Sequence, residues 1–162
     1  MKLREYHPRD FDALWRIDQQ CFATGIAYSR AELASYINRR GAFTLLMEED
    51  DKNIAAFLVA EADPAKIGHI LTIDVLPDHQ RKRLGTHLLE AAEARLESLG
   101  CRSLLLEVAV DNRAAIAFYK RHGFDVIETI PRYYQDSLDA LLMGKRLGKQ
   151  KPSLRCLSSA PK

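Results

Sequence analysis

The segment Val75–Thr86 joins the end of an apolar run to a basic stretch and the start of a leucine-rich run. Backbone N–H groups at the N-terminus of a helix, together with the helix dipole, bind a pyrophosphate without needing side chains. Arg81, Lys82 and Arg83 would add positive charge, and Gly85 would let the backbone approach the ligand closely. The segment therefore favours a phosphate-bearing ligand. A basic, solvated helix start in which Gly85 serves packing is the alternative.

The runs on both sides of this segment predict the elements that hold it. Ile67–Leu76 has the pattern of a strand, Gln80–Leu99 that of a helix ended by Gly100, and Ser103–Val110 that of a buried strand. The predicted helix has one apolar stripe, formed by Leu84, Leu88, Leu89, Ala92, Leu96 and Leu99. A strand, a helix and a strand in this order predict a parallel crossover.

The N-terminal part carries clear helix-boundary signals. Pro8 can open a first helix, because proline is tolerated in the first turn. Ser29 with Glu32 three residues later is a capping box, which predicts a second helix over Arg30–Arg40. Gly41 would end it in a left-handed conformation.

The C-terminal part predicts one more helix and completes the sheet. Asn112 can cap a helix that runs to His122 and ends at Gly123-Phe124. Further strands are predicted at Met1–Tyr6, Ala42–Met47, Ile54–Ala60, Asp125–Ile130 and Leu138–Lys145. The order β-α-α-β-β-β-α-β-α-β-β predicts an α+β fold. We expect a mixed, mostly antiparallel sheet of about seven strands with helices on both faces.

Composition narrows the class of protein. A chain of 162 residues with 47% hydrophobic and 28% charged residues is ordinary for one globular domain. No apolar run approaches the roughly 20 residues that span a bilayer, and Met1–Glu5 has no signal-peptide pattern. Cys21, Cys101 and Cys156 are odd in number and scattered, which fits a reducing compartment. We therefore predict a cytoplasmic location and no membrane partner.

Neither a metal site nor a nucleic-acid partner is indicated. His69, His79, His87 and His122 show no ligand spacing, and Cys101 has no histidine partner that would activate it as a nucleophile. The net charge of +2 includes four basic residues after Leu147 with no acid among them, so the body carries −2. Such a body does not favour nucleic-acid binding.

The last residues differ in composition from the rest. Residues 148–162 contain two prolines and three serines and little apolar periodicity, which predicts a disordered basic tail behind a domain over residues 1–147. A solvated tail is the simpler interpretation, and contact with ribosomal RNA or another acidic surface is the alternative.

Three motifs give the chain a family resemblance. Gln80-Arg81-Lys82-Arg83-Leu84-Gly85 resembles the coenzyme A loop of the GNAT superfamily of N-acetyltransferases, Gln/Arg-x-x-Gly-x-Gly/Ala, with Arg83 at the first glycine. Leu106–Tyr119 with Gly123-Phe124 resembles bacterial ribosomal-protein alanine N-acetyltransferases, and Arg132-Tyr133-Tyr134 resembles the paired tyrosines of N-terminal acetyltransferases. Because a helix start does not demand positive φ, arginine is expected to fit at position 83.

The resemblance covers about residues 1–147 and implies a metal-independent transfer from acetyl-CoA to a primary amine, most simply a protein N-terminal α-amine. It implies Glu107 as general base through a water and Tyr119 as general acid. The Val75 N–H would stabilise the oxyanion. Acetyl-CoA would be bound by Ile73, Val75, Arg81, Lys82, Arg83, Leu84, Gly85, Thr86, Asn112 and Tyr119. Phe22, Tyr28, Tyr133 and Tyr134 would bind the acceptor.

Each of these residues also has a structural interpretation. Glu107 could be the solvent-facing member of an alternating strand, Tyr119 a core residue and Asn112 only a helix cap. Tyr28 could pack on Leu33 as a hydrophobic staple. At the level of function, the alternatives are transfer to lysine side chains or small amines, and a non-catalytic acetyl-CoA-binding module.

Overall fold

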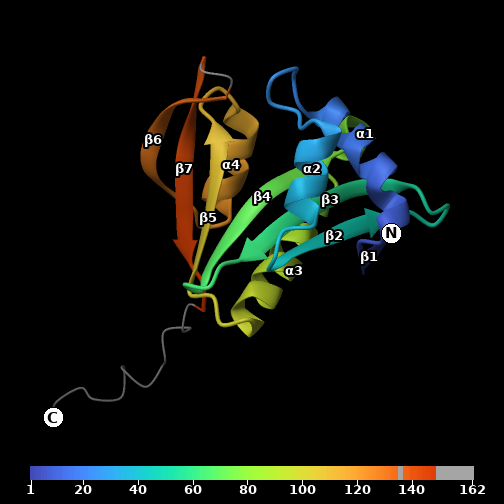
Figure 1. The fold of residues 1–162 in the computed structure, drawn as a ribbon, viewed down its shortest axis with the longest axis horizontal. Helices are drawn as coiled ribbons and strands as arrows, with labels where there is room; N and C mark the ends of the chain where they lie inside the picture. The colour runs from blue at the N-terminus through green and yellow to red at the C-terminus, as the bar shows by residue number, and fades with distance from the viewer. Residues whose placement is uncertain (135–136, 149–162) are drawn as a thin grey trace, which may run out of the picture.

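A computed structural model describes residues 1–134 and 137–148. Its single sheet has the strand order β1-β2-β3-β4-β5-β7-β6, and every neighbouring pair is antiparallel except β4 with β5 (Figure 1). The strands are β1 Lys2–Glu5, β2 Ala42–Glu48, β3 Ile54–Ala62, β4 Ile67–Val75, β5 Ser103–Ala109, β6 Asp125–Tyr134 and β7 Leu138–Arg146. The predicted fold class, the parallel crossover and both antiparallel ends of the sheet are confirmed.

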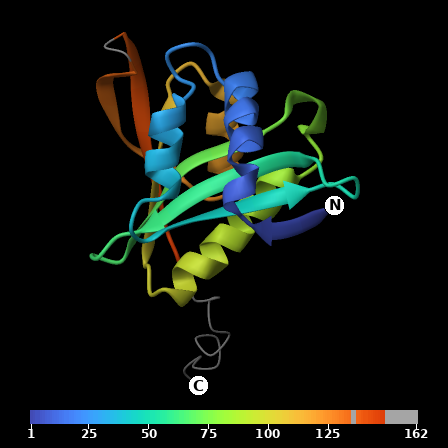
Figure 2. The ribbon, with the colours of Figure 1, turned by 45° about the vertical axis from the view of Figure 1, so that its right-hand side comes forward.

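In the described part of the chain, four α-helices cover the two faces of the sheet: α1 Phe11–Cys21, α2 Arg30–Ile37, α3 Leu84–Ser98 and α4 Arg113–Arg121. Figure 2 shows α1 and α2 together on one face, with α3 crossing behind the strands. Alternate residues of β3 supply the two cores, Phe57 and Val59 toward α1 and α2 and Leu58 and Ala60 toward α3. None of the helices in the described ranges is long and apolar enough to cross a membrane.

The predicted helix boundaries that rest on local hydrogen bonds are present. The Ser29 hydroxyl accepts from the Glu32 N–H at 3.1 Å, and the Ser29 N–H donates to the Glu32 carboxylate at 2.8 Å. Gly123 has φ +88°, and the Phe124 N–H donates to the Tyr119 carbonyl at 3.0 Å, which closes the end of α4. These signals were readable because all their partners lie within five residues.

Several helix boundaries differ from the prediction. Pro8 opens a 3-10 turn, Pro8–Asp10, and α1 begins only at Phe11. The helix α3 begins at Leu84 and not at Gln80, because Arg81 and Arg83 have φ +62° and +64°, which no right-handed helix contains. The helix α2 ends at Ile37, three residues before the predicted end, and the Asn38 side chain donates to a carbonyl of the last turn.

The last hairpin also departs from the prediction. The strand β6 continues beyond Ile130 to Tyr134, so both tyrosines of the Arg132-Tyr133-Tyr134 motif belong to a strand and not to a loop. Its register against β7 is irregular between Ile130 and Tyr134. The predicted tail, apart from Gly148, lies outside the described residues.

The strands β4 and β5 separate in the middle of the sheet. They pair only over Ile67–Ile70 and Ser103–Leu106, and beyond these residues each continues without the other. Close to this point Leu71 has no partner on β3, because Val59 pairs with Thr72 and Ala60 with Ile70. The bulge turns the following residues of β4, and the gap between the two strands leaves backbone groups free for a ligand.

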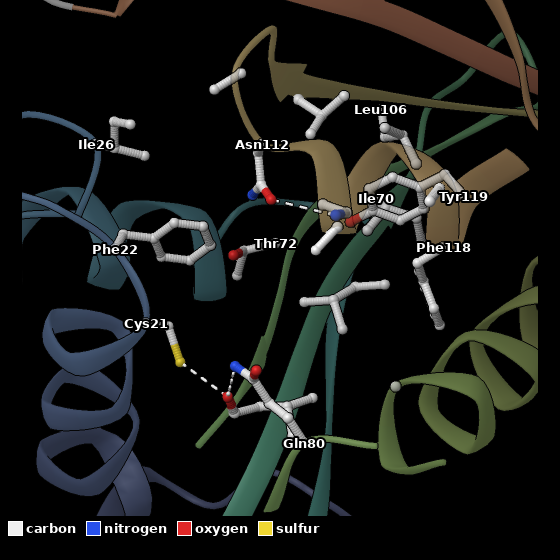
Figure 3. Close-up of a pocket in the computed structure, with 18 of the residues that line it drawn as sticks. Cys21, Phe22, Ile26, Ile70, Thr72, Gln80, Leu106, Asn112, Phe118 and Tyr119 are labelled. Atoms are coloured by element: carbon white, nitrogen blue, oxygen red, sulfur yellow. Dashed lines mark hydrogen bonds between the residues drawn. The ribbon is translucent and has the colours of Figure 1, made fainter. Parts of the chain in front are cut away.

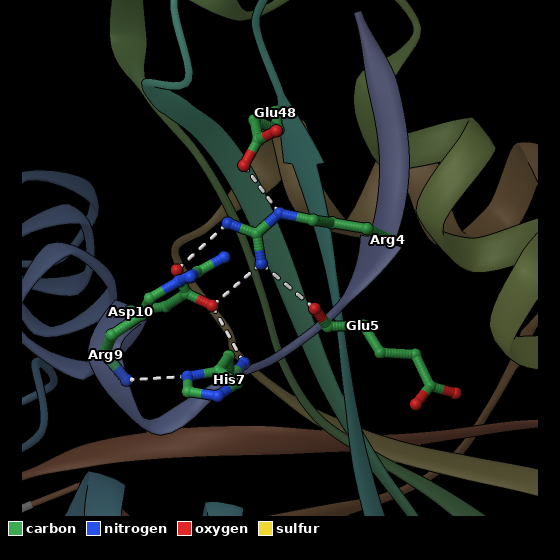
Figure 4. Close-up of polar contacts among 6 residues, drawn as sticks. All are labelled: Arg4, Glu5, His7, Arg9, Asp10 and Glu48. Carbon is green, nitrogen blue, oxygen red and sulfur yellow. Dashed lines mark hydrogen bonds and ion pairs between the residues drawn. The ribbon is translucent and has the colours of Figure 1, made fainter.

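A compact charged cluster fixes the N-terminus far from this gap (Figure 4). The Arg4 guanidinium donates to both carboxylate oxygens of Asp10, at 2.8 and 2.9 Å, and to Glu48 at 2.6 Å. The backbone N–H of His7 also donates to Asp10, at 2.8 Å. The Arg4 hydrogen bond and positive charge lower the pKa of Asp10. The cluster ties β1 to β2 and to the turn that precedes α1.

Candidate active site

A cavity of about 1170 Å³ opens where β4 and β5 separate (Figure 3). The loop between α1 and α2, the ends of both strands, the start of α3 and one side of α4 surround it. The predicted site residues in its wall are Phe22, Tyr28, Ile73, Val75, Arg81, Arg83, Leu84, Gly85, Thr86, Glu107, Asn112, Tyr119 and Tyr134. Lys82 and Tyr133 are not part of the wall.

The start of α3 has the character of an anion site. Arg83 precedes the helix and makes no side-chain cap, so no cap competes for the first helical N–H groups. Arg83 needs a left-handed backbone, contrary to the expectation that arginine would fit without positive φ. A Cβ on Gly85 would lie 3.4 Å from the Phe118 ring, so this glycine also serves the packing of α4 on α3.

The backbone of Val75 faces the gap. The next N–H along the chain, that of Leu76, donates to Ala55 on β3, so the Val75 groups point to the opposite edge of β4. The Val75 carbonyl accepts from the Cys21 thiol and from the Gln80 amide, each at 3.3 Å (Figure 3). Burial raises the pKa of Cys21 to about 12, so this thiol is neutral at pH 7 and is a poor nucleophile.

Glu107 lies on the sheet face opposite α3, where its oxygen is 2.6 Å from Nε2 of His69. Its neighbours Leu106 and Val108 are in the α3-side core, as the alternation predicted. The other face is a cavity wall and not open solvent, since the Glu107 side chain is only 18% exposed. The contact of His69 with Glu107 was not predicted from the sequence. Its only signal was a polar residue in an apolar strand, whose nearness to Glu107 depends on the parallel register of β4 and β5.

His69 belongs to a longer polar row. Its Nδ1 is 3.9 Å from a Glu61 oxygen, and Glu61 accepts from Arg39 at 2.9 Å. The row begins at Glu107 in the cavity and ends at the partly exposed Arg39. His69 thus lies between the carboxylates of Glu107 and Glu61.

Tyr119 and Asn112 each have a structural role and also line the cavity. Tyr119 packs edge-on against Phe118 and Phe124, at 5.3 and 5.6 Å between ring centroids, and also lines the cavity. Burial raises its pKa, which keeps the phenol protonated at neutral pH. Asn112 caps α4 by accepting from the Ala115 N–H at 3.2 Å, and its side chain is directed toward the cavity in Figure 3.

Two pairs of tyrosines reach the cavity, each through one member, Tyr28 and Tyr134. Tyr28 and Tyr36 have ring centroids 4.9 Å apart, and Tyr133 and Tyr134 have theirs 4.8 Å apart. Burial and the charge of Glu107 raise the pKa of Tyr133 to about 12. Tyr28 also belongs to the apolar cluster that contains Leu33, so it serves both packing and the cavity wall.

The histidines do not form a metal centre. Across residues 1–134 and 137–148 no three His, Cys, Asp or Glu side chains are grouped as metal ligands. Two other histidines make local contacts: His79 contacts Glu49 at 2.9 Å, and His122 contacts Thr86 at 3.1 Å.

Comparison with known proteins agrees with this geometry. Residues 11–124 match the model of the acetyltransferase (GNAT) family. The ribosomal protein bS18 alanine N-acetyltransferase of Salmonella typhimurium is 34% identical over 139 residues, covering 83% of this chain and 89% of that protein. An N-alpha-acetyltransferase of Sulfurisphaera tokodaii is 40% identical over 83 residues, 51% of this chain and 50% of that protein. The crystal structure of the ribosomal-protein-S18-alanine N-acetyltransferase from Escherichia coli has a TM-score of 0.81 at 28% identity, over 94% and 97% of the two chains.

This chain therefore belongs to the GNAT family of acetyltransferases. Members of the family use acetyl-CoA as the acetyl donor.

Proposed function

We propose that this protein acetylates the N-terminal α-amine of a protein, with acetyl-CoA and acceptor bound together. The observation that carries the proposal is the position of the Glu107 carboxylate, which contacts His69 and shares the cavity wall with Tyr134, whose ring packs on that of Tyr133. An N-terminus offers a reacting amine followed at once by peptide groups, which two phenols can hydrogen bond. A lysine side chain has no peptide backbone at that distance from its nitrogen.

The protonation state of the acceptor points the same way. An α-amino group has a pKa of about 8 and a lysine side chain one of about 10.4, so the α-amine loses its proton more readily. The names of the two relatives, an N-alpha-acetyltransferase and a ribosomal protein alanine N-acetyltransferase, support an acceptor of this class. We propose alanine as a preferred first residue and the cytoplasm as the location.

The cavity suits acetyl-CoA, which would supply the thioester carbonyl that the amine attacks. The uncapped first turn of α3 with Arg81 and Arg83 would bind its phosphates, and Lys82 would add charge from the same loop. Leu84, Gly85 and Thr86 contribute the backbone N–H groups, and the Ile73 and Val75 backbones with Asn112 would hold the pantetheine arm.

The chain's own residues can move the protons. Glu107 would take the proton of the amine through one water, and His69 at 2.6 Å would carry it away from the cavity. The Val75 N–H would stabilise the negative charge that develops on the carbonyl oxygen. Tyr119, protonated at neutral pH, would donate its proton to the departing sulfur. Phe22 and Tyr28 would contact the first acceptor residues.

One peptide experiment decides the acceptor. Peptides with a free N-terminus and one internal lysine are incubated with acetyl-CoA, and mass spectrometry locates the acetyl group while CoA release gives the rate. We expect acetylation at the α-amine, fastest with alanine or another small first residue. Acetyl mainly on lysine would assign the protein to lysine or small-amine acetylation, and acetyl-CoA binding without CoA release would make it a binding module.

A further inference from the structure

Two aspartates that have no cationic partner among the described residues meet beneath the cavity, and one of them, Asp18, is part of its wall. Asp18 of α1 and Asp74 of β4 are both completely buried. The Thr72 hydroxyl donates to one oxygen of Asp74 at 2.5 Å, and the Tyr28 N–H donates to one oxygen of Asp18 at 2.7 Å. Neither aspartate has a part in the acetyl transfer described above.

In the described part of the chain, the second carboxyl oxygen of each aspartate lacks a hydrogen-bond donor. Asp18 Oδ1 and Asp74 Oδ2 are buried and have no donor among the described residues, and a hydrogen bond between the two carboxyl groups acts on the pKa of both. Two carboxylates can only accept, so no hydrogen bond can form between them while both are ionised. One proton between them satisfies both oxygens at once and leaves a single negative charge.

The surroundings favour that proton. The titratable groups coupled to the pair are Cys21 on α1, Tyr28 on the following loop, Glu32 on α2 and Tyr119 on α4, and none of these is a cation. Burial, followed by the charge of Asp18, raises the pKa of Asp74, and burial also raises the pKa of Asp18.

The pair lies where the loop between α1 and α2 (residues 22–29) meets β4. Asp18 holds the Tyr28 N–H, while the Tyr28 hydroxyl donates to the carbonyl of the bulged Leu71 at 3.2 Å. Cys21, at the end of α1, donates to the Val75 carbonyl. The loop is thus attached to β4 along the stretch that lines the cavity, and the acid pair is the part of this attachment that needs a proton.

We propose that Asp18 and Asp74 share one proton and act as positioning residues that hold the α1–α2 loop on β4, so that Phe22 and Tyr28 are in place for the acceptor. Only the assignment of this loop to the acceptor rests on the proposed function. Loss of the shared proton at alkaline pH places two negative charges side by side without a cation, which separates the loop from the strand.

Two measurements on the full chain test the shared proton without any acetyl transfer. The infrared difference between wild type and Asp74→Asn at neutral pH should contain a protonated carboxyl band. Hydrogen exchange of the Tyr28 amide, corrected for its intrinsic rate, should be slow in the wild type at neutral pH and fast once the pair ionises. Asp74→Asn keeps a donor toward Asp18, so its Tyr28 amide should stay protected at both pH values. Absence of the carboxyl band, or equal alkaline loss of protection in both proteins, would overturn the proposal.

Steady-state kinetics with the best peptide found above test the positioning role. Asp74→Ala should raise the acceptor KM about tenfold, the equivalent of one lost hydrogen bond, and leave the acetyl-CoA KM unchanged. Asp74→Asn should stay within about twofold of wild type and lose the alkaline rise in acceptor KM. The positioning role would be refuted if Asp74→Ala is folded and its Tyr28 amide exchanges fast, yet its acceptor KM is unchanged. If no peptide is acetylated, the proposed function fails. The infrared and exchange measurements still test whether Asp18 and Asp74 share a proton.

Discussion

The cluster around Arg4 and the acid pair beneath the cavity both withdraw carboxyl groups from water, but they are compensated in opposite ways. At the N-terminus a guanidinium faces two carboxylates and a backbone N–H completes the set. Beneath the cavity two buried carboxyl groups face each other, and one oxygen of each has no donor. The first arrangement is satisfied in one protonation state and belongs to the scaffold. The second is satisfied only with an extra proton, which suits a site that responds to its surroundings.

The loop before α3 also has strained backbone. Arg81 and Arg83, beside the cavity, have left-handed backbones, as do Lys52 and Lys66 in turns elsewhere, whereas no residue of the Arg4 cluster has positive φ. Unfavourable conformations persist where the surrounding structure and a ligand require them. The cavity side therefore holds both the uncompensated acids and the strained loop.

The largest expected effect is on turnover, and it should differ between two carboxylates that are equally exposed. Glu107→Gln should lower kcat by roughly two orders of magnitude and leave acetyl-CoA affinity near that of the wild type, because it removes the proposed general base. Glu48→Gln is the matched control, since Glu48 and Glu107 are both 18% exposed and Glu48 lies in the Arg4 cluster. Turnover should be unchanged in Glu48→Gln. Equal rates in the two variants would contradict the role of Glu107.

The next effect concerns stability. Asp10→Ala leaves the Arg4 guanidinium without its main partner and should lower the free energy of unfolding by about 2–3 kcal/mol. For a chain of this length that lowers the melting temperature by roughly 4–12 °C. Asp12→Ala removes an exposed partner of Arg30, on α1 just after Asp10, and should leave the melting temperature unchanged. Similar melting curves for the two variants would show that the Arg4 cluster is not stabilising.

The two groups of acids should also give opposite pH dependence. The lowered pKa of Asp10 stabilises the fold above its ordinary value of 3.8, and this stability is lost as the pH falls through the lower folded value. The pair has a raised pKa, so its contribution is complete below about 3.8 and declines as the pH rises toward the folded value. Urea midpoints across the pH range should show Asp10→Asn losing the acid-side decline and Asp74→Asn losing the alkaline-side decline. If the urea midpoints of Asp10→Asn and Asp74→Asn depended on pH in the same way, the two groups of acids would not differ as expected.

The smallest effect is expected at the strained loop. Arg83→Gly removes a left-handed arginine and should raise the free energy of unfolding by about 0.5 kcal/mol, the relieved strain less the entropy that glycine loses on folding. Lys82→Gly, at a neighbour whose φ is not positive, should lower it. Acetyl-CoA affinity at low salt should fall in Arg83→Gly and be retained in Arg83→Lys, measured by calorimetry. Equal destabilisation by both glycine variants would show that Arg83 is unstrained.

Much of the scaffold could be predicted because its causes are local. The Ser29 capping box, the leucine stripe of α3 and the Gly123 helix end involve residues within a few turns of one another. The alternation of Leu106, Glu107 and Val108 correctly placed Glu107 off the α3-side core. The start of α3 was wrong, because the leucine periodicity does not report that Arg81 and Arg83 have left-handed backbones.

By itself, the sequence determined the fold class, the order of the strands and helices along the chain, and the family of acetyltransferases. The tertiary structure alone decided which polar groups meet. His69 reaches Glu107 across 38 residues because of four parallel residue pairs, and the bulge at Leu71 turns Thr72 and Asp74 toward α1 and Asp18. Periodicity and capping act between near neighbours in the chain, whereas register, bulges and the separation of two strands are settled only when the whole sheet packs.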